Sequence, residues 1–241
     1  MSAVHGRLTR ILHGAFDLSG FLNSHIATST ARALDATPYQ ATGKRYVSDF
    51  RDGSLQMKGF FEADETDEDR LDDVLQAAID DATPNPVTIA PEGDTSVGNR
   101  GLLMEAVEIQ VNVEAPVAEL VMNQATFRGQ IDSGVVLAPL AAYTATANGT
   151  SVDNGASSAN GGVAHQHVTL VSGTSPTNTT IVQHSSDNST FADLITFSEK
   201  TAAGSERATV TGTVNRYVRA RRVIGGSATP TFTQAISFAR L

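Results

Sequence analysis

Three histidines stand close together in the second half of the sequence. His165 and His167 are two residues apart, which places them on one face of a strand, and His184 falls in the next predicted strand. Three neutral imidazoles that converge within about 2.1 Å of a metal could bind zinc. The alternative, which the sequence favours, is that these histidines lie on the surface of their strands. We therefore predict no metal ligands.

Arginines form a second cluster at Arg216, Arg219, Arg221 and Arg222. Such a run could bind a phosphate or another small anion, but only Tyr217 is interleaved with it, and binding of single-stranded nucleic acid favours aromatic stacking partners. The alternative is that the arginines lie on an exposed strand face, where charge discourages pairing with other strands. The sequence favours this alternative.

Carboxylates are concentrated between residues 62 and 81. The spacing of Asp64, Asp67 and Asp69 lacks both the glycine and the final glutamate of a calcium-binding loop. The same residues suit the start of a helix, because Thr66 can cap it and Glu68 can face the helix dipole. Apolar residues then recur at helical spacing up to Pro84, so the segment predicts a helix with a solvated acidic face.

Motifs for catalysis are missing from the sequence. There is no glycine-rich phosphate loop, no H-E-x-x-H and no G-x-S-x-G, and the chain has no cysteine. A glycan hydrolase would need two carboxylates across a cleft, and residues 153–241 contain only Asp153, Asp187, Asp193, Glu199 and Glu206 in no recognisable setting. We expect no catalytic and no cofactor-binding residues, and hence not an enzyme.

Charge divides the 241-residue chain into two parts. Residues through Leu140 include 21 acidic and 10 basic residues, whereas Ala141 onward has 5 acidic and 7 basic residues, within a net charge of −9. The first part should therefore repel nucleic acid over most of its surface. No apolar run reaches the length of a signal peptide or of a membrane span, so we expect no membrane insertion.

The pattern of the first part predicts mostly strands around one helix. Asp52-Gly53 is typical of a turn, and residues from Ser54 to Glu62 alternate as a strand. Residues 38–53 have few large apolar side chains and predict a long exposed loop. Further alternating runs at 101–113 and 117–130 predict strands that follow the helix.

The second part predicts an all-β sandwich, because short strands recur at regular spacing between clusters of Ser, Gly, Asn and Pro. The expected fold class is mainly β. Its first domain, residues 1–140, is a β-sandwich or barrel with one flanking helix. A linker at 141–152 leads to a jelly-roll or immunoglobulin-like sandwich at 153–241.

Residues 5–140 resemble the major tail tube protein of long-tailed, siphovirus-like bacteriophages of actinobacteria. The resemblance rests on Asp17-Leu18-Ser19-Gly20 after an opening strand, Leu34-Asp35-Ala36-Thr37, the polar loop through Gly43 and Tyr46, the strand Leu55–Phe61, the acidic helix, and the run APVAELVMNQATFRGQIDSGVVL. In one departure, residues 37–43 read TPYQATG where related proteins have a Thr-Thr-Phe-Gly-like turn. The second part is similar to β-sandwich domains appended to phage structural proteins.

The resemblance implies a structural virion protein that self-assembles into stacked hexameric rings, a tail tube through which DNA passes. Its partners would be itself, the tape measure protein, the baseplate or initiator proteins and the tail terminator, with no cofactor. It would be assembled in the host cytoplasm, with residues 153–241 exposed on the outside of the tube. The candidate ring-stacking residues are Tyr39, Lys44, Arg45, Tyr46, Asp49 and Arg51.

Two other functions fit the sequence. A contractile-tail inner tube or a gene-transfer particle would need the same subunit chemistry, since the sheath is a separate protein. A virion decoration or adhesin protein would instead use the C-terminal sandwich to bind cell-surface glycans, and it would not polymerise.

Overall fold

A computed structural model describes residues 5–61, 71–81 and 83–241, and the chain is mainly β, as the sequence predicted. Its strands are paired antiparallel, and the described residues contain one α-helix, α1 (Leu71–Asp80). No helix in this part of the chain is long and apolar enough to cross a membrane. The chain divides into two compact units, and their segments alternate along the sequence.

Unit 2 comprises Phe21–Pro84 and Ala106–Ile131. Its sheet has the order β3-β4-β7-β6, built from β3 (Leu22–Asp35), β4 (Tyr46–Phe60), β7 (Met122–Arg128) and the later part of β6 (Arg100–Glu114). Each strand pairs antiparallel with its neighbours. The order makes β4 and β7 the central strands, with β3 at one edge.

Helix α1 packs on one face of this sheet. Leu71, Val74, Leu75 and Ala78 are buried at helical spacing, whereas Ile79 remains 37% exposed. The helix lies so close to β4 that a Cβ placed on Gly59 would meet Leu71 Cδ2 at 2.5 Å. The predicted helix is thus confirmed over residues 71–80, while the predicted cap Thr66 and the first-turn residues Asp67, Glu68 and Asp69 lie outside the described residues.

The predicted turn at Asp52-Gly53 is wrong, because β4 runs without interruption from Tyr46 to Phe60. Gly53 is there for close approach: a Cβ would lie 2.3 Å from the carbonyl oxygen of Gly129 and 2.8 Å from Ile131 Cγ1. The predicted loop at 38–53 is shorter for the same reason. Its residues from Tyr46 onward pair with β3. They are a strand because of these backbone hydrogen bonds, although their side chains do not alternate in the pattern typical of a strand.

Unit 1 comprises Met1–Gly20, Asn85–Glu105 and Asp132–Leu241. Its strands follow the order β12-β11-β14-β8-β6-β5-β1-β2, with β13 on β11 and with β9 and β10 on β14. The bounds are η1 (Gly6–Leu8), β1 (Arg10–His13), β2 (Phe16–Asp17), β5 (Asn85–Ala90), β8 (Ile131–Tyr143), β9 (Ala147–Asn148), β10 (Val152–Asp153), β11 (Gly162–Ser185), β12 (Ala192–Thr196), β13 (Gly204–Val210) and β14 (Tyr217–Arg240).

The predicted domain boundary at 140/141 differs from this division. Residues 141–143 continue β8, which pairs with β14, and the expected linker includes β9 and part of β10. Segments before residue 106 also complete unit 1. The order of segments along the sequence could not show this division, because strands far apart in the chain pair in the same sheet.

Two 24-residue strands, β11 and β14, form a ribbon that doubles back on itself. Irregular register and positive φ angles at Gly173 and Gly226 mark the bend. Side chains 14 residues apart then meet: Gln166 Nε2 donates to Thr180 Oγ1 at 3.0 Å. The doubled ribbon encloses an apolar core that includes Leu137, Ala164, Val182, Phe197, Val218, Ile236 and Phe238.

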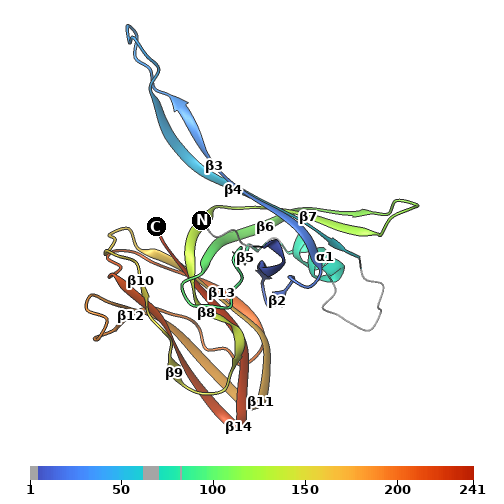
Figure 1. Cartoon of the computed structure of the whole chain (residues 1–241), viewed down its shortest axis with the longest axis vertical. Helices are drawn as coiled ribbons and strands as arrows, with labels where there is room; N and C mark the ends of the chain where they lie inside the picture. Colours follow the sequence, from blue (N-terminus) through green and yellow to red (C-terminus); the bar gives the residue numbers. More distant parts are fainter. Residues whose placement is uncertain (1–4, 62–70, 82) are drawn as a thin grey trace. The chain divides into compact units, whose positions relative to one another are not determined.

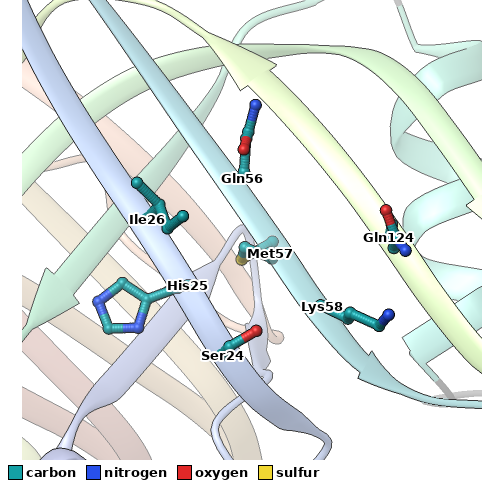
Figure 2. A pocket seen from close by; sticks show the side chains of 7 residues that line it. All are labelled: Ser24, His25, Ile26, Gln56, Met57, Lys58 and Gln124. Atoms are coloured by element: carbon teal, nitrogen blue, oxygen red, sulfur yellow. The ribbon is translucent and has the colours of Figure 1, made fainter.

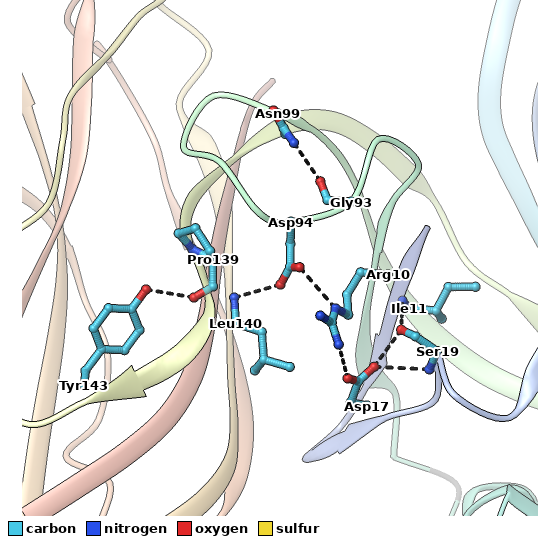
Figure 3. Close-up of polar contacts among 10 residues, drawn as sticks. All are labelled: Arg10, Ile11, Asp17, Ser19, Gly93, Asp94, Asn99, Pro139, Leu140 and Tyr143. Atoms are coloured by element: carbon cyan, nitrogen blue, oxygen red, sulfur yellow. Dashed lines mark hydrogen bonds and ion pairs between the residues drawn. The ribbon is translucent and has the colours of Figure 1, made fainter. Parts of the chain in front are cut away.

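An ion-pair network ties the first strands of unit 1 to its later loops (Figure 3). Arg10 contacts Asp17, and its Nε donates to Asp94 Oδ1 at 3.1 Å. Asp94 is only 4% exposed and also accepts from the backbone N–H of Leu140 at 2.7 Å. Asp17 Oδ1 accepts hydrogen bonds from both the backbone N–H and the hydroxyl of Ser19. The Asp17-Leu18-Ser19-Gly20 motif is therefore a structural turn.

Candidate assembly interface

A long two-stranded arm extends from the sheet of unit 2 (Figure 1). β7 pairs with β4 only from Ser54 to Phe60, whereas β3 and β4 continue to pair as far as Asp35 and Tyr46. We call residues 29–53 the arm. Beyond the end of β7, no described strand other than β3 pairs with this part of β4. Gly53 at the base of the arm is buried, whereas nearly all of the other arm residues whose side chains are described are exposed.

The end of the arm has its own hydrogen bonds. Asp35 Oδ1 accepts from the N–H of Thr37 at 3.0 Å, and Thr37 Oγ1 accepts from the N–H of Arg45 at 2.9 Å. The N–H of Ala41 donates to the carbonyl of Pro38, which forms a turn with Gln40 at a φ of 72°. A positive φ is unfavourable for glutamine, so the turn presents Tyr39 to solvent at some cost in strain.

The candidate stacking residues lie in two elements. Tyr39, Lys44 and Arg45 belong to the loop at the arm's end, and Tyr39 is fully exposed at 103%. Tyr46, 59% exposed, begins β4 with the Lys44 ammonium 6.0 Å from its ring centre. Arg51 is exposed further along β4; Asp49 lies in the same strand, and its side chain is outside the description.

The outer edge of β3 is unprotected. Among the described strands, β3 pairs only with β4, and none of its 14 residues is buried. It contains no proline and no lysine, and its only formal charges are Arg32 and Asp35. Proteins commonly use proline, lysine or a covering segment to block such an edge, because its free N–H and C=O groups can pair with another chain. β3 lacks these protections.

The open face of the unit 2 sheet, opposite α1, is polar but carries no net charge. Residues opposite one another in register share this face, among them Gln56, Thr126 and Gln110. Lys58 Nζ lies 2.9 Å from Glu114 Oε2, and Arg128 Nη1 lies 3.1 Å from Asp52 Oδ2. These four charged side chains therefore neutralise one another in two ion pairs within the face.

A shallow hollow of about 190 Å³ lies over β3, β4 and β7 (Figure 2). Its lining includes Ser24, Ile26, Gln56, Lys58 and Gln124, and Gln124 Nε2 donates to Glu114 Oε2 at 2.8 Å. No group of three or more acidic or histidine side chains in the described ranges could hold a metal ion. Its lining is mostly neutral, and its one formally charged side chain, Lys58, is paired with Glu114.

One carboxylate on the other face is unusual. Glu108 is 5% exposed, lies opposite Phe127 in register, and has no hydrogen-bond partner among the described residues. Burial raises the pKa of Glu108 to about 8, so the group is protonated at neutral pH. The sequence carried a signal for it, because Glu108 follows Ala106 in the buried phase of an alternating strand.

The histidines singled out in the sequence are buried in unit 1, which corrects the expected surface placement. His165 and His167 are fully buried beneath Thr88 of β5, because β11 is covered on both faces there. Thr88 Oγ1 lies 3.1 Å from His165 Nδ1 and 2.8 Å from His167 Nε2. His184 is only partly buried; its Nδ1 accepts from the N–H of Asn215 at 3.2 Å.

The arginine cluster is also only partly exposed. Arg222 is 8% exposed and stacks over the ring of Tyr143 at 3.9 Å, while Arg219 stacks over Phe191 at 3.7 Å. Arg216 forms a two-bond contact with Asp153, both bonds at 2.7 Å. Aromatic rings that could have formed a sugar platform are therefore covered by guanidinium groups.

Comparison with protein families finds no match for this chain, and neither does comparison with curated proteins. Solved structures give weak similarities in fold. A chain of a native gene transfer agent virion is 11% identical with a TM-score of 0.43, covering 55% of this chain and 98% of that one. The SPP1 Dit protein, described as a paradigm of the hub adsorption apparatus in phages that infect Gram-positive hosts, is 12% identical with a TM-score of 0.40. That match covers 96% of this chain and 98% of the Dit chain.

A chain of a contractile injection system, the PVC sheath-tube complex in its extended state, is 8% identical with a TM-score of 0.44. The match covers 56% of this chain and 93% of that chain. The three structures come from a gene transfer agent virion, a phage adsorption hub and a contractile injection system. Because the TM-scores are below 0.5, the function of this chain has to be argued from its own geometry.

Proposed function

We propose that the chain is a structural subunit of a bacteriophage tail that assembles with copies of itself through the outer edge of β3. The observation that carries the proposal is the edge itself: 14 residues long, exposed and without proline or lysine. A strand of a second copy can pair with it and satisfy its free backbone groups.

Repetition of this contact continues the sheet from copy to copy. If the β3 edges of two copies paired with each other, the assembly would stop at a dimer. A sheet that continues needs the β3 edge of one copy to pair with a different surface of the next, which is a heterologous contact that closes into a ring or continues as a filament. We infer rings of six, stacked into a tail tube, from the resemblance of residues 5–140 to tail tube proteins. The arm at 29–53 would then reach the neighbouring ring.

The open face of the sheet is suited to line a channel for DNA. Its amide and hydroxyl side chains carry no net charge because its ionic groups are paired. DNA binding needs unpaired cations that replace counterions, and this face offers none of known position. The acidic residues Asp72 and Asp73 lie on α1, which packs against the other face. Passage without adhesion is the property that an ejection channel requires.

The remaining partners follow from this role. A tube of fixed length needs a tape measure protein, a baseplate or initiator and a terminator, so these are the expected neighbours in the virion tail. Residues 153–241 would be exposed on the outside of the tube.

The test blocks the edge without altering the core. Thr28 and Thr30 are exposed on β3, and the double variant Thr28→Lys/Thr30→Lys places two cations on the pairing strand. The matched control is Thr211→Lys/Thr213→Lys, two exposed threonines with the same spacing in a loop of unit 1. Sedimentation should show large assemblies for the wild type and the control, but monomer for the edge variant. Equal assembly by all three would refute edge pairing.

A further inference from the structure

The apolar residues left exposed in unit 2 are concentrated at two ends of its sheet. One group is on the arm, and includes Tyr39, Tyr46 and Val47 at 103%, 59% and 56% exposure. The other lies around the β6–β7 connection, and we call it the end patch: Phe60, Phe61, Val113, Val117, Leu120 and Val121, exposed by 36% to 108%. Exposed apolar clusters of this kind mark interaction surfaces.

The register shows that these two groups leave the sheet in opposite directions. Ser54 pairs with Arg128 where the arm begins, and Phe60 pairs with Met122 where the end patch begins. β6 and β7 pair from Val107 with Arg128 to Glu114 with Met122, so their connection lies at the far end of the strands from the arm. The two ends are therefore placed for contact between successive copies along the strand direction.

The arm has a small excess of positive charge, with four basic residues against Asp35, Asp49 and Asp52, and Asp52 is paired with Arg128 outside the arm. Among the described residues, Arg32, Arg45 and Arg51 on the arm have no carboxylate partner, while Lys44 lies 3.8 Å from Asp35. The turn of the end patch contains Glu119, exposed and held by a hydrogen bond from its N–H to the carbonyl of Pro116 at 3.4 Å. A basic arm and an acidic turn attract one another, and the apolar residues beside them supply the area to be buried.

We propose that the arm of one copy docks on the end patch of a second copy. Tyr39 is the natural anchor, since an exposed aromatic side chain at a hairpin tip buries much area at little cost in entropy. Val117 and Leu120 provide the apolar surface, and Arg45 faces Glu119. The contact is heterologous and repeats without limit, which makes it the contact along the stack of rings; this inference rests on the proposed function.

Cysteine crosslinking tests this pairing, because the chain has no cysteine of its own. Thr42→Cys in the arm and Ala118→Cys in the end patch both replace exposed residues and leave the anchors in place. Two differently tagged variants are mixed, assembled and oxidised. The Thr42→Cys and Ala118→Cys mixture should crosslink several-fold more than Thr42→Cys mixed with Ser157→Cys, an exposed control in unit 1.

Two further variants locate the contact. Leu120→Asp should abolish the crosslink, whereas Leu170→Asp should leave it unchanged, because Leu170 lies in unit 1 and is exposed by 60% against 67% for Leu120. Glu119→Arg in the Ala118→Cys chain should weaken the crosslink, and Arg45→Glu in the Thr42→Cys chain should restore it. A crosslink no stronger than the Ser157→Cys control, in samples that still form wild-type assemblies, would overturn the docking and leave edge pairing through β3 intact. Loss of all assembly in the wild type would instead refute the proposed function.

Discussion

Acid should unfold unit 1 through its buried histidines. For neutral His167, Nδ1–H donates to the carbonyl of Gly14 at 2.8 Å, so Nε2 is bare and accepts from the hydroxyl of Thr88. Thr88 Oγ1 in turn accepts from Nδ1–H of His165 at 3.1 Å. A proton added to Nε2 of His167 creates a donor there, so the Thr88 hydroxyl would have to rotate away and give up the bond that it donates. The added charge would also be buried, and for both reasons the folded state favours neutral imidazoles.

The size of the effect follows from the pKa values. Burial lowers the pKa of His13 and of His167 from 6.5 to about 4, and it lowers the pKa of His165 well below 6.5. His13 also opposes the charge on His167, and Arg207, which lies 3.1 Å from Glu105, opposes the charge on His165. Because the folded pKa values lie below the unfolded ones, this stability is present above pH 6.5 and is lost as the pH falls.

From pH 7 to pH 5 the linkage relation gives a loss of about 2 kcal/mol for a histidine with these two pKa values, hence about 4 kcal/mol for His13 and His167 together. His165 adds to the loss in the same direction. Since a domain is stable by only about 5–15 kcal/mol, this is a large fraction of the total.

The assay is urea unfolding followed by circular dichroism at pH 7 and pH 5, at concentrations where sedimentation shows monomer. His167→Gln cannot titrate, and the difference in unfolding free energy between the two pH values should shrink by about 2 kcal/mol. The comparison uses the difference, so a variant of lower overall stability is still informative. His5→Gln, in an exposed position at the start of η1, is the control and should keep the wild-type difference. Protonation of Glu108 in unit 2 stabilises the folded chain over the same pH range, so the test is the comparison of His167→Gln with the wild type and not the wild-type value alone. The same pH 7 to pH 5 difference for His167→Gln and for the wild type would refute the reasoning.

Two further predictions concern unit 2. Glu108→Gln should raise the unfolding free energy at pH 7 by about 1–3 kcal/mol, because the folded chain keeps Glu108 protonated with a pKa of about 8, which costs stability as the pH rises above 4.5. Chemical unfolding measures this change, and Glu119→Gln at an exposed position should have no effect. A destabilised Glu108→Gln would contradict the burial argument. Gly53→Ala should lower the thermal stability by about 1–3 kcal/mol, because its Cβ meets the Gly129 carbonyl at 2.3 Å, while Gly43→Ala, with nothing within 4 Å, should be neutral. Equal melting temperatures for the two glycine variants would contradict the close packing of β4.

Periodicity was enough to predict the helix of unit 2 and the strand segments that pack around it. The apolar spacing from Leu71 to Ala78 predicts α1, and alternation from Leu55 onward predicts the strand that packs beneath it. The arm was not predicted as a ribbon, because residues 46–53 have little apolar patterning and become a strand only through their partner β3. Strand formation there is a tertiary effect, which a single-sequence pattern does not contain.

The candidate site shows the same division. Tyr39, Lys44 and Arg45 could be singled out because polar and aromatic residues in a long connection suggest function. The open edge of β3 and the end patch could not, since exposure and pairing depend on which strands meet. The buried state of His165 and His167 was missed for a related reason: β11 is covered on both faces, one by its folded partner ribbon and the other by β5. Alternation alone cannot distinguish such a strand from a half-exposed one.

Negative-stain electron microscopy of the purified wild-type chain over a range of concentrations tests the central claim most directly. Self-assembly through the edge of β3 predicts six-fold rings or tubes with a central channel, which become longer as the concentration rises, and it predicts that Thr28→Lys/Thr30→Lys forms neither. Small separate particles at every concentration, with the wild type indistinguishable from the edge variant, would contradict the account.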